Sequence, residues 1–366
     1  MSGKRGELTW PCGHETRKTI DMYKRFKPKR TFGRQTLGIV VLVAYCISCS
    51  YTQNPEKAGA LNVQKPQERP VMSDTRPLFS GPAWFTTTAP TYVQVGPTKI
   101  AYRRIGNGPP LILIHGWPFT SYTYSKITPY LACHFTCYLP DSPGLGLSEW
   151  SEGTDFSFPG QAHTFQAFID ALGIGRYSMI AHNTGASVAR LLAADAGERL
   201  EKFIILNTEI PGERPPWFPL YRKLMFIPGF GGVFRLFLRS ETFLKSSMGF
   251  GGCFNNPDLI DERFRQQYIV PLLEDDRRLE GAFRYLKDGL DFSLIDSMPR
   301  IHAQITAPVL LIWGAADPTF PVTGARRMVA EFPHAAGLKE IKSGKLLVQE
   351  EFPEEVARIA LDFLTH

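Results

Sequence analysis

The stretch YSMIAHNTGASVARLLAADA at residues 177–196 decides the fold of this chain. Residues 177–181 predict a buried strand, and the run of small residues that begins at Ala186 has the spacing of a helix. Between them, AHNTG places small residues on both sides of Asn183. Small neighbours allow a tight strand-to-helix turn, which presents the central side chain at the helix N-terminus. The stretch therefore predicts a strand, a sharp turn at Asn183, and a helix.

The same alternation continues on both sides of this stretch. Strands are predicted at residues 91–95, 99–103, 111–114, 136–139, 177–181, 202–206, 309–313 and 338–341. Helices are predicted at residues 121–132, 159–172, 186–196, 322–332 and 353–364. Strands that alternate with helices indicate an α/β protein with a mainly parallel, doubly wound sheet. Residues 209–300 interrupt the pattern, and because they are aromatic-rich and mostly helical in period they predict an inserted helical cap.

Three further motifs stand at the ends of predicted strands. They are HGWP at residues 115–118, DSPGLGLS at residues 141–148 and GAAD at residues 314–317. With the AHNTG turn, the set resembles the α/β-hydrolase superfamily, in particular its capped haloalkane dehalogenases and epoxide hydrolases. The resemblance covers residues 91–365 and implies an eight-stranded, mainly parallel sheet with an inserted cap. It also implies hydrolysis of a small apolar substrate of haloalkane, epoxide or ester type, with no cofactor and no metal.

The resemblance assigns roles to five positions. In that family an Asp at the turn forms an ester with the substrate, a His activates the hydrolysing water, and an acid orients the His. The acid corresponds to Asp317, and the backbone N–H groups that stabilise developing charge correspond to Trp117 and Thr184. The nucleophile position is Asn183, and the His position is Leu346, which lies 29 residues after Asp317.

Two of these positions depart from the family pattern. The amide oxygen of Asn183 carries no formal charge and is a poor nucleophile, and Leu346 cannot accept a proton. Lys345 stands beside it, and we expect a surface or ion-pair role for this lysine. Three hypotheses stay open: a hydrolase with a modified site, an inactive pseudo-hydrolase that binds a small apolar ligand, and an engineered chain arrested at the ester step. Two altered positions fit the engineered chain poorly.

The first fifty residues differ in composition from the rest. Residues 1–35 carry a net charge of +7, so the remaining residues sum to −1. The apolar run LGIVVLVAYCI at residues 37–47 follows and is closed by small residues. A basic stretch followed by a short apolar run is the pattern of an export signal. The alternatives are an uncleaved membrane anchor, a lipoprotein with its lipid on Cys49, and an extended reading frame on a cytoplasmic protein.

The remaining expectations concern linkers and partners. The proline-containing residues 51–90 predict a linker, which places the packed domain at residues 91–366. Because the positive charge belongs to the N-terminal segment, we expect no nucleic-acid binding, and contact with a membrane only through that segment. The six cysteines have neither zinc-site nor disulfide-scaffold spacing. The substrate and the oligomeric state are left open.

Overall fold

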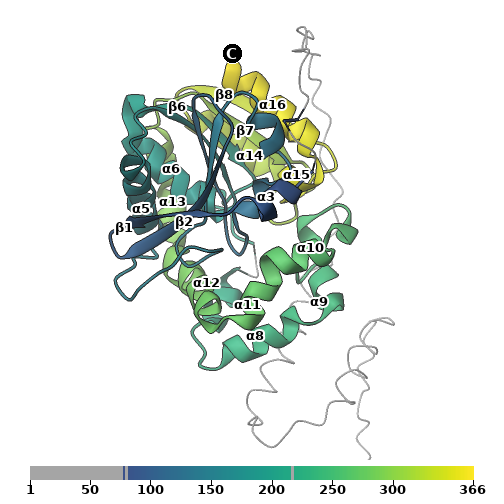
Figure 1. The fold of residues 1–366 in the computed structure, drawn as a ribbon. Helices are drawn as coiled ribbons and strands as arrows, with labels where there is room; N and C mark the ends of the chain where they lie inside the picture. The colour runs from purple at the N-terminus through teal and green to yellow at the C-terminus, as the bar shows by residue number, and fades with distance from the viewer. Residues whose placement is uncertain (1–76, 79–80, 216–217) are drawn as a thin grey trace, which may run out of the picture. The chain divides into compact units, whose positions relative to one another are not determined.

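The structure is a computed structural model that describes residues 77–78, 81–215 and 218–366 (Figure 1). The predicted export signal, Cys49 and most of the predicted linker lie outside these residues. Among the residues described, no helix combines the length and the apolar character that a membrane span requires.

The centre of the fold is an eight-stranded sheet in the order β1-β2-β4-β3-β5-β6-β7-β8. Strand β2 pairs antiparallel with β1 and β4, and every other pairing is parallel. The strands are β1 Thr91–Val95, β2 Thr98–Ile105, β3 Pro110–Ile114, β4 Thr136–Pro140, β5 Tyr177–His182, β6 Leu200–Leu206, β7 Val309–Gly314 and β8 Ala335–Ile341. The predicted mainly parallel sheet and its eight strands are confirmed. Buried runs such as Leu111–Ile114 are continuous apolar sequences because parallel strands are covered on both faces.

Helices cover both faces of the sheet. Contacts join α5 (Phe158–Ala171), α6 (Thr184–Ala196) and α13 (Phe292–His302) in one layer, and α4 (Thr128–Leu131) contacts α16 (Pro353–Thr365) in the other. Figure 1 shows α5 and α6 on one side of the sheet and α16 on the other. Two shorter helices, α14 (Val322–Met328) and α15 (Val348–Glu351), follow β7 and β8.

One predicted helix is divided in two. Residues 121–132 form a 3₁₀ turn at Ser121–Tyr124 and then the short helix α4, which has Pro129 in its first turn. Proline has no N–H to continue a preceding helix but fits the first turn of a new one, so the single predicted helix was wrong.

The packed domain begins before residue 91. Helix α3 (Ala83–Thr87) buries Trp84 and Phe85 against the core. The Trp84 indole N–H donates to the Ser125 carbonyl at 2.8 Å, and the Arg103 guanidinium lies 3.8 Å from the centre of the Phe85 ring. The prediction of a linker up to residue 90 is therefore wrong at this end, because two aromatic side chains supply enough apolar surface to order it.

The insertion forms a helical cap, which Figure 1 shows at one end of the sheet. Its helices are α7 Phe218–Leu224, α8 Phe230–Leu238, α9 Glu241–Lys245, α10 Glu262–Phe264, α11 Val270–Glu274 and α12 Asp276–Gly289. Aromatic pairs form its core, such as Phe264 and Tyr268 with ring centres 4.9 Å apart. The predicted limit at residue 300 was too late, since α13 already packs on α6 in the sheet layer.

Candidate functional site

The turn between β5 and α6 holds Asn183 in a strained backbone conformation. Asn183 has φ 54° and ψ −141°, and among the residues described it is the one non-glycine residue with positive φ. Asparagine adopts positive φ more readily than most residues do. A Cβ on Gly185 would lie 2.1 Å from the His115 carbonyl oxygen, and one on Gly116 would lie 2.5 Å from Asn183 Oδ1. The two glycines thus let the HGWP turn pack directly against the turn that carries Asn183.

The side chains of Asn183 and Thr184 accept hydrogen bonds from the two backbone N–H groups predicted to stabilise developing charge. The Thr184 N–H donates to Asn183 Oδ1 at 2.7 Å, and the Trp117 N–H donates to Thr184 Oγ1 at 2.8 Å. The Thr184 hydroxyl in turn donates to the Tyr285 hydroxyl of α12 at 3.2 Å. The two N–H groups that would stabilise a developing negative charge are therefore already hydrogen-bonded within the protein.

Trp117 connects the HGWP turn to the cap. Its indole N–H donates to the carbonyl of Ala282 in α12 at 2.8 Å, and its side chain is partly buried. The cap and the strand ends consequently meet at Trp117 and at the Thr184–Tyr285 pair.

Asp317 lies after β7, where the family resemblance places the acid. Its Oδ2 accepts from the Asn207 side-chain amide at 2.6 Å, and its Oδ1 accepts from the Thr319 N–H at 2.8 Å. Burial raises the pKa of Asp317 to about 7 against the opposing effect of these hydrogen bonds. Asn207, which follows β6, also accepts from the Gly314 N–H at 2.9 Å and so ties the ends of β6 and β7 together.

Leu346 lies in the loop after β8 and is 5% exposed. Its carbonyl is 2.9 Å from His182 Nε2, and because a carbonyl only accepts, that nitrogen carries the proton. His182 Nδ1 is buried and has no hydrogen-bond partner among the residues described. Burial lowers the pKa of His182 to about 3, so the imidazole is neutral and fixes the backbone of this loop.

Cys253 of the cap lies against the same loop. Its carbonyl accepts from the Leu347 N–H at 3.1 Å. Burial raises the pKa of the Cys253 thiol, and the nearby carboxyl of Asp317 raises it further. The thiol therefore stays protonated and is a weak nucleophile.

Behind Asn183, a buried polar network centres on Arg190 of α6. The Arg190 guanidinium donates to Ser187 Oγ at 2.6 Å and to the Glu209 carbonyl at 3.1 Å. Ser187 donates to Glu209 Oε2 at 2.6 Å, and the Thr208 hydroxyl donates to the Asn183 carbonyl at 2.8 Å. We call Ser187, Arg190, Thr208 and Glu209 the Arg190 network. Thr208 joins this network to the strained turn through the Asn183 carbonyl.

Glu350 links helix α15 to the cap. Its Oε1 accepts from the Tyr268 hydroxyl at 2.7 Å and from Thr123 Oγ1 at 3.0 Å. Burial raises the pKa of Glu350 to about 7. The sequence motifs did not identify Glu350, Asn207 or the Arg190 network as parts of the site. The only signal for these residues in the sequence is a polar residue that stands next to a strand end or within an apolar segment.

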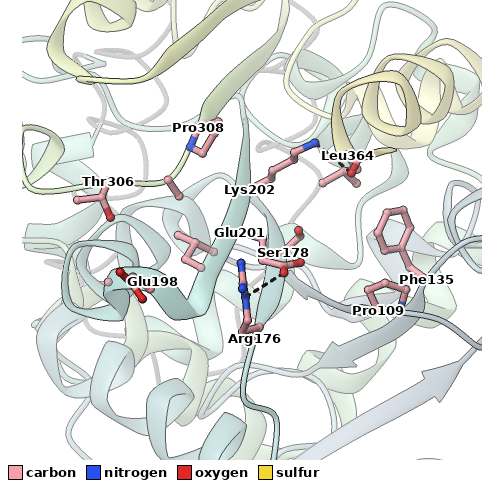
Figure 2. Close-up of a pocket in the computed structure, with 13 residues that line it drawn as sticks. Pro109, Phe135, Arg176, Ser178, Glu198, Glu201, Lys202, Thr306, Pro308 and Leu364 are labelled. Carbon is pink, nitrogen blue, oxygen red and sulfur yellow. Dashed lines mark hydrogen bonds and ion pairs between the residues drawn. The ribbon is translucent and has the colours of Figure 1, made fainter. Parts of the chain in front are cut away.

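A cavity of about 710 Å³ lies at the opposite end of the sheet, where the parallel strands begin (Figure 2). Arg176 pairs with Glu201 at 3.1 Å, and the Lys202 ammonium donates to the Phe363 carbonyl at 2.9 Å. Arg176 and Lys202, the two cations that line this cavity, therefore already have partners within the protein. The motif residues instead meet where the strands end, which is the usual ligand position in open α/β sheets.

The comparisons with known proteins identify the family. The sequence profile of the alpha/beta hydrolase fold matches residues 109–352. Haloalkane dehalogenase 2 of Mycobacterium tuberculosis is 26% identical over 273 residues, 72% of this chain and 91% of that protein. The soluble epoxide hydrolase of a Corynebacterium species is 37% identical over 114 residues, 31% of this chain and 39% of that protein.

Solved structures share the fold. Haloalkane dehalogenase DbeA from Bradyrhizobium elkani matches with a TM-score of 0.63 and 21% identity, over 76% of this chain and 97% of that chain. Epoxide hydrolase CorEH matches with a TM-score of 0.63 and 22% identity, over 76% of this chain and 98% of that chain. The profile spans more than half of the sequence, and the solved structures share the fold. The chain belongs to the α/β-hydrolase fold family.

Proposed function

We propose that this chain is a ligand-binding member of the α/β-hydrolase family that holds a small apolar molecule under its cap and does not carry out ester-forming hydrolysis. The observation that carries the proposal is the pair of hydrogen bonds from the Trp117 and Thr184 N–H groups to Thr184 Oγ1 and Asn183 Oδ1. These bonds occupy the donors that a hydrolase of this family needs for the charge on its reacting atoms.

The nucleophile position supports the same conclusion. Attack on carbon requires a carboxylate here, and Asn183 offers a neutral amide whose oxygen already accepts the Thr184 N–H. The strained turn survives because asparagine tolerates positive φ, so the local fold persists without the nucleophile.

The base position completes the argument. Leu346 has no group that accepts a proton, and its backbone is held by His182. Asp317 has no imidazole at Leu346 to orient and is hydrogen-bonded to Asn207 instead. An ester formed by any route would therefore lack the activated water that removes it.

Ligand binding is supported by the apolar character of the boundary between the cap and the strand ends. Phe119 beside the HGWP turn contacts Phe250 and Tyr268 of the cap, with ring centres 6.1 and 5.3 Å away. The haloalkane dehalogenase and epoxide hydrolase relatives are named for small, weakly polar substrates. A small apolar molecule of this kind is the ligand we infer.

The proposal is tested by incubating the full chain with a panel of haloalkanes, epoxides and esters. We expect a ligand-induced change in tryptophan fluorescence that is reduced in Trp117→Phe, and neither a covalent adduct by intact mass nor product above background. Turnover that persists in Asn183→Ala would overturn the proposal.

A hydrolase with a different catalytic set is the second candidate, and Asp317 is the observation that favours it. A carboxyl with a pKa of about 7 exchanges its proton near neutral pH, as a general base must. This candidate predicts turnover that Asp317→Asn abolishes and Asn183→Ala leaves intact.

For residues 1–50 we propose export of the chain or its retention on a membrane. The basic stretch and the apolar run at residues 37–47 support this proposal. In a bacterial host, Cys49→Ser would release the protein from the membrane fraction if lipid is attached there, and an unchanged distribution would exclude lipidation.

A further inference from the structure

The outer side of the cap carries apolar side chains that the fold leaves uncovered. Phe226 is 54% exposed, Ile227 39% and Leu236 52%. They lie within eleven residues of one another, in the turn before α8 and on α8 itself. Scattered apolar side chains are normal at a protein surface, whereas a cluster of large ones indicates an interaction site.

Helix α8 buries an apolar face and exposes one large apolar side chain, Leu236, on the opposite face. Its inner face buries Val233, Phe234 and Leu238, and the Phe234 ring centre lies 5.5 Å from that of Phe283 in α12. Its outer face presents Gly232, Leu236 and Arg239, all exposed and spaced as one helical stripe. Figure 1 shows α8 at the outer edge of the cap, away from the sheet. The apolar side chains of the inner face pack within the cap, whereas Leu236 on the outer face has no cover among the residues described.

Positive charge surrounds the exposed apolar side chains. Residues 218–239 contain four basic and no acidic residues. Lys223 and Arg239 are exposed and form no ion pair with any residue that the structure describes. The Lys287 ammonium lies 4.7 Å from the centre of the Phe226 ring.

The acidic residues near this surface do not cancel that charge. Asp276 pairs with Arg235, and Glu241 pairs with Lys245 at 3.0 Å. Asp288, next to Lys287, is exposed. Residues 218–239 together with Asp276, Lys287 and Asp288 contain five basic and two acidic residues, so a positive net charge remains on this surface. Lys223 and Arg239 are its exposed cations without a described ion-pair partner.

We propose that residues 226–229 and the outer face of α8, here called the cap surface, dock on an anionic phospholipid bilayer. Phe226, Ile227 and Leu236 enter the boundary between headgroups and acyl chains, and Lys223 and Arg239 contact lipid phosphates. A second copy of the chain fits less well, because a symmetric contact would bring the two positive surfaces together. This membrane contact is separate from the one expected of residues 37–47, and it does not depend on the proposed ligand-binding function.

The test is hydrogen–deuterium exchange of the full chain with and without vesicles of equal parts phosphatidylcholine and phosphatidylglycerol. The readout is local, so the N-terminal segment can hold every variant at the vesicle without affecting the comparison. We expect exchange in peptides covering residues 224–239 to slow by roughly tenfold with these vesicles, and less with pure phosphatidylcholine. Peptides covering residues 176–202, at the other end of the sheet, are expected to keep their exchange rates.

Two variants and one control decide the outcome. Phe226→Ser/Ile227→Ser/Leu236→Ser is expected to remove the protection, and Lys223→Gln/Arg239→Gln to reduce it and weaken its salt dependence. Tyr92→Ser removes a 42% exposed aromatic side chain from β1 and is expected to leave the protection unchanged. Equal protection in the wild type and the triple variant, or no protection in either, would overturn the proposal. Protection without vesicles that grows with protein concentration would assign the cap surface to a second copy instead.

Discussion

Two parts of the candidate site differ in how closely they follow the hydrolase pattern. The packed backbone of the turn follows it, whereas the side chains at positions 183 and 346 depart from it. Gly116, Gly185 and the Arg190 network still form a tightly packed turn at the end of β5. Asn183 and Leu346 carry groups that neither attack carbon nor accept a proton. A strained turn depends on space and hydrogen bonds, which asparagine satisfies, whereas catalysis depends on one charge and one imidazole. The fold therefore does not depend on the groups that ester-forming hydrolysis requires.

The comparison predicts that the largest stability effect follows a change to the packed backbone. Gly185→Ala is expected to lower the free energy of unfolding by roughly 3–5 kcal/mol, because its Cβ would meet the His115 carbonyl oxygen at 2.1 Å. Gly175→Ala is the matched control, since nothing lies within 4 Å of its Cβ. Denaturant unfolding of both variants measures the difference. Equal midpoints would show that the turn is not tightly constrained.

Removal of the cation from the Arg190 network is expected to have the next largest effect. Arg190→Met keeps the volume but leaves Ser187 and Glu209 buried without their donor, which costs about 3 kcal/mol. Arg199→Met breaks a partly exposed ion pair with Asp170 and is expected to cost less than about 1 kcal/mol. A small loss in Arg190→Met would mean that the network does not support the turn.

The pH dependence of stability tests the raised pKa of the buried acid Glu350. In the folded protein burial raises the pKa of Glu350 to about 7, above its unfolded value, so the folded state binds the proton more tightly. The contribution of Glu350 to the free energy of unfolding should therefore fall as the pH rises from about 5 to about 8.

Glu350→Gln keeps one oxygen for Tyr268 and Thr123 but does not ionise. It should match the wild type near pH 5 and exceed its stability by roughly 2–3 kcal/mol near pH 8. Asp317 titrates in the same direction in both proteins. Parallel stability curves for the two proteins would refute the raised pKa.

The smallest effect is expected at the occupied donor. Thr184→Val leaves the Trp117 N–H without its 2.8 Å acceptor and should cost about 1–2 kcal/mol. Thr184→Ser keeps the hydroxyl and should cost less. Thermal unfolding of both variants measures this, and a Val variant as stable as the Ser variant would show that the hydrogen bond contributes nothing.

Much of the fold was predictable because its signals are local. Buried parallel strands are continuous apolar runs, and the turn at Asn183 is marked by small flanking residues. The sequence analysis missed that the helix predicted at residues 121–132 is divided near Pro129, and that helix α3 packs on the domain. Both features depend on competition between local conformational preference and tertiary contacts. The cap limit was placed too late for a similar reason.

The sequence predicted which residues stand at the candidate site, but not the hydrogen bonds between them. Asn183, Trp117, Thr184 and Asp317 stand next to strand ends, where a motif can be read. That Thr184 Oγ1 occupies the Trp117 N–H depends on a contact across 67 residues, which no local pattern encodes. The Arg190 network and the Glu350–Tyr268 bond are likewise formed by residues far apart in the chain.

The most direct test of the central claim compares four full-length proteins: the wild type, Asn183→Asp, Leu346→His and the double variant. Each is incubated with the same haloalkanes, epoxides and esters, with adducts measured by intact mass and turnover by product. We predict no turnover in the wild type, an accumulating ester adduct in Asn183→Asp, no adduct in Leu346→His, and turnover only in the double variant, because nucleophile and base act as one unit. Turnover in the double variant should be slow, since Thr184 Oγ1 still occupies the Trp117 N–H. Steady turnover by the wild type that survives Asn183→Ala would contradict the account.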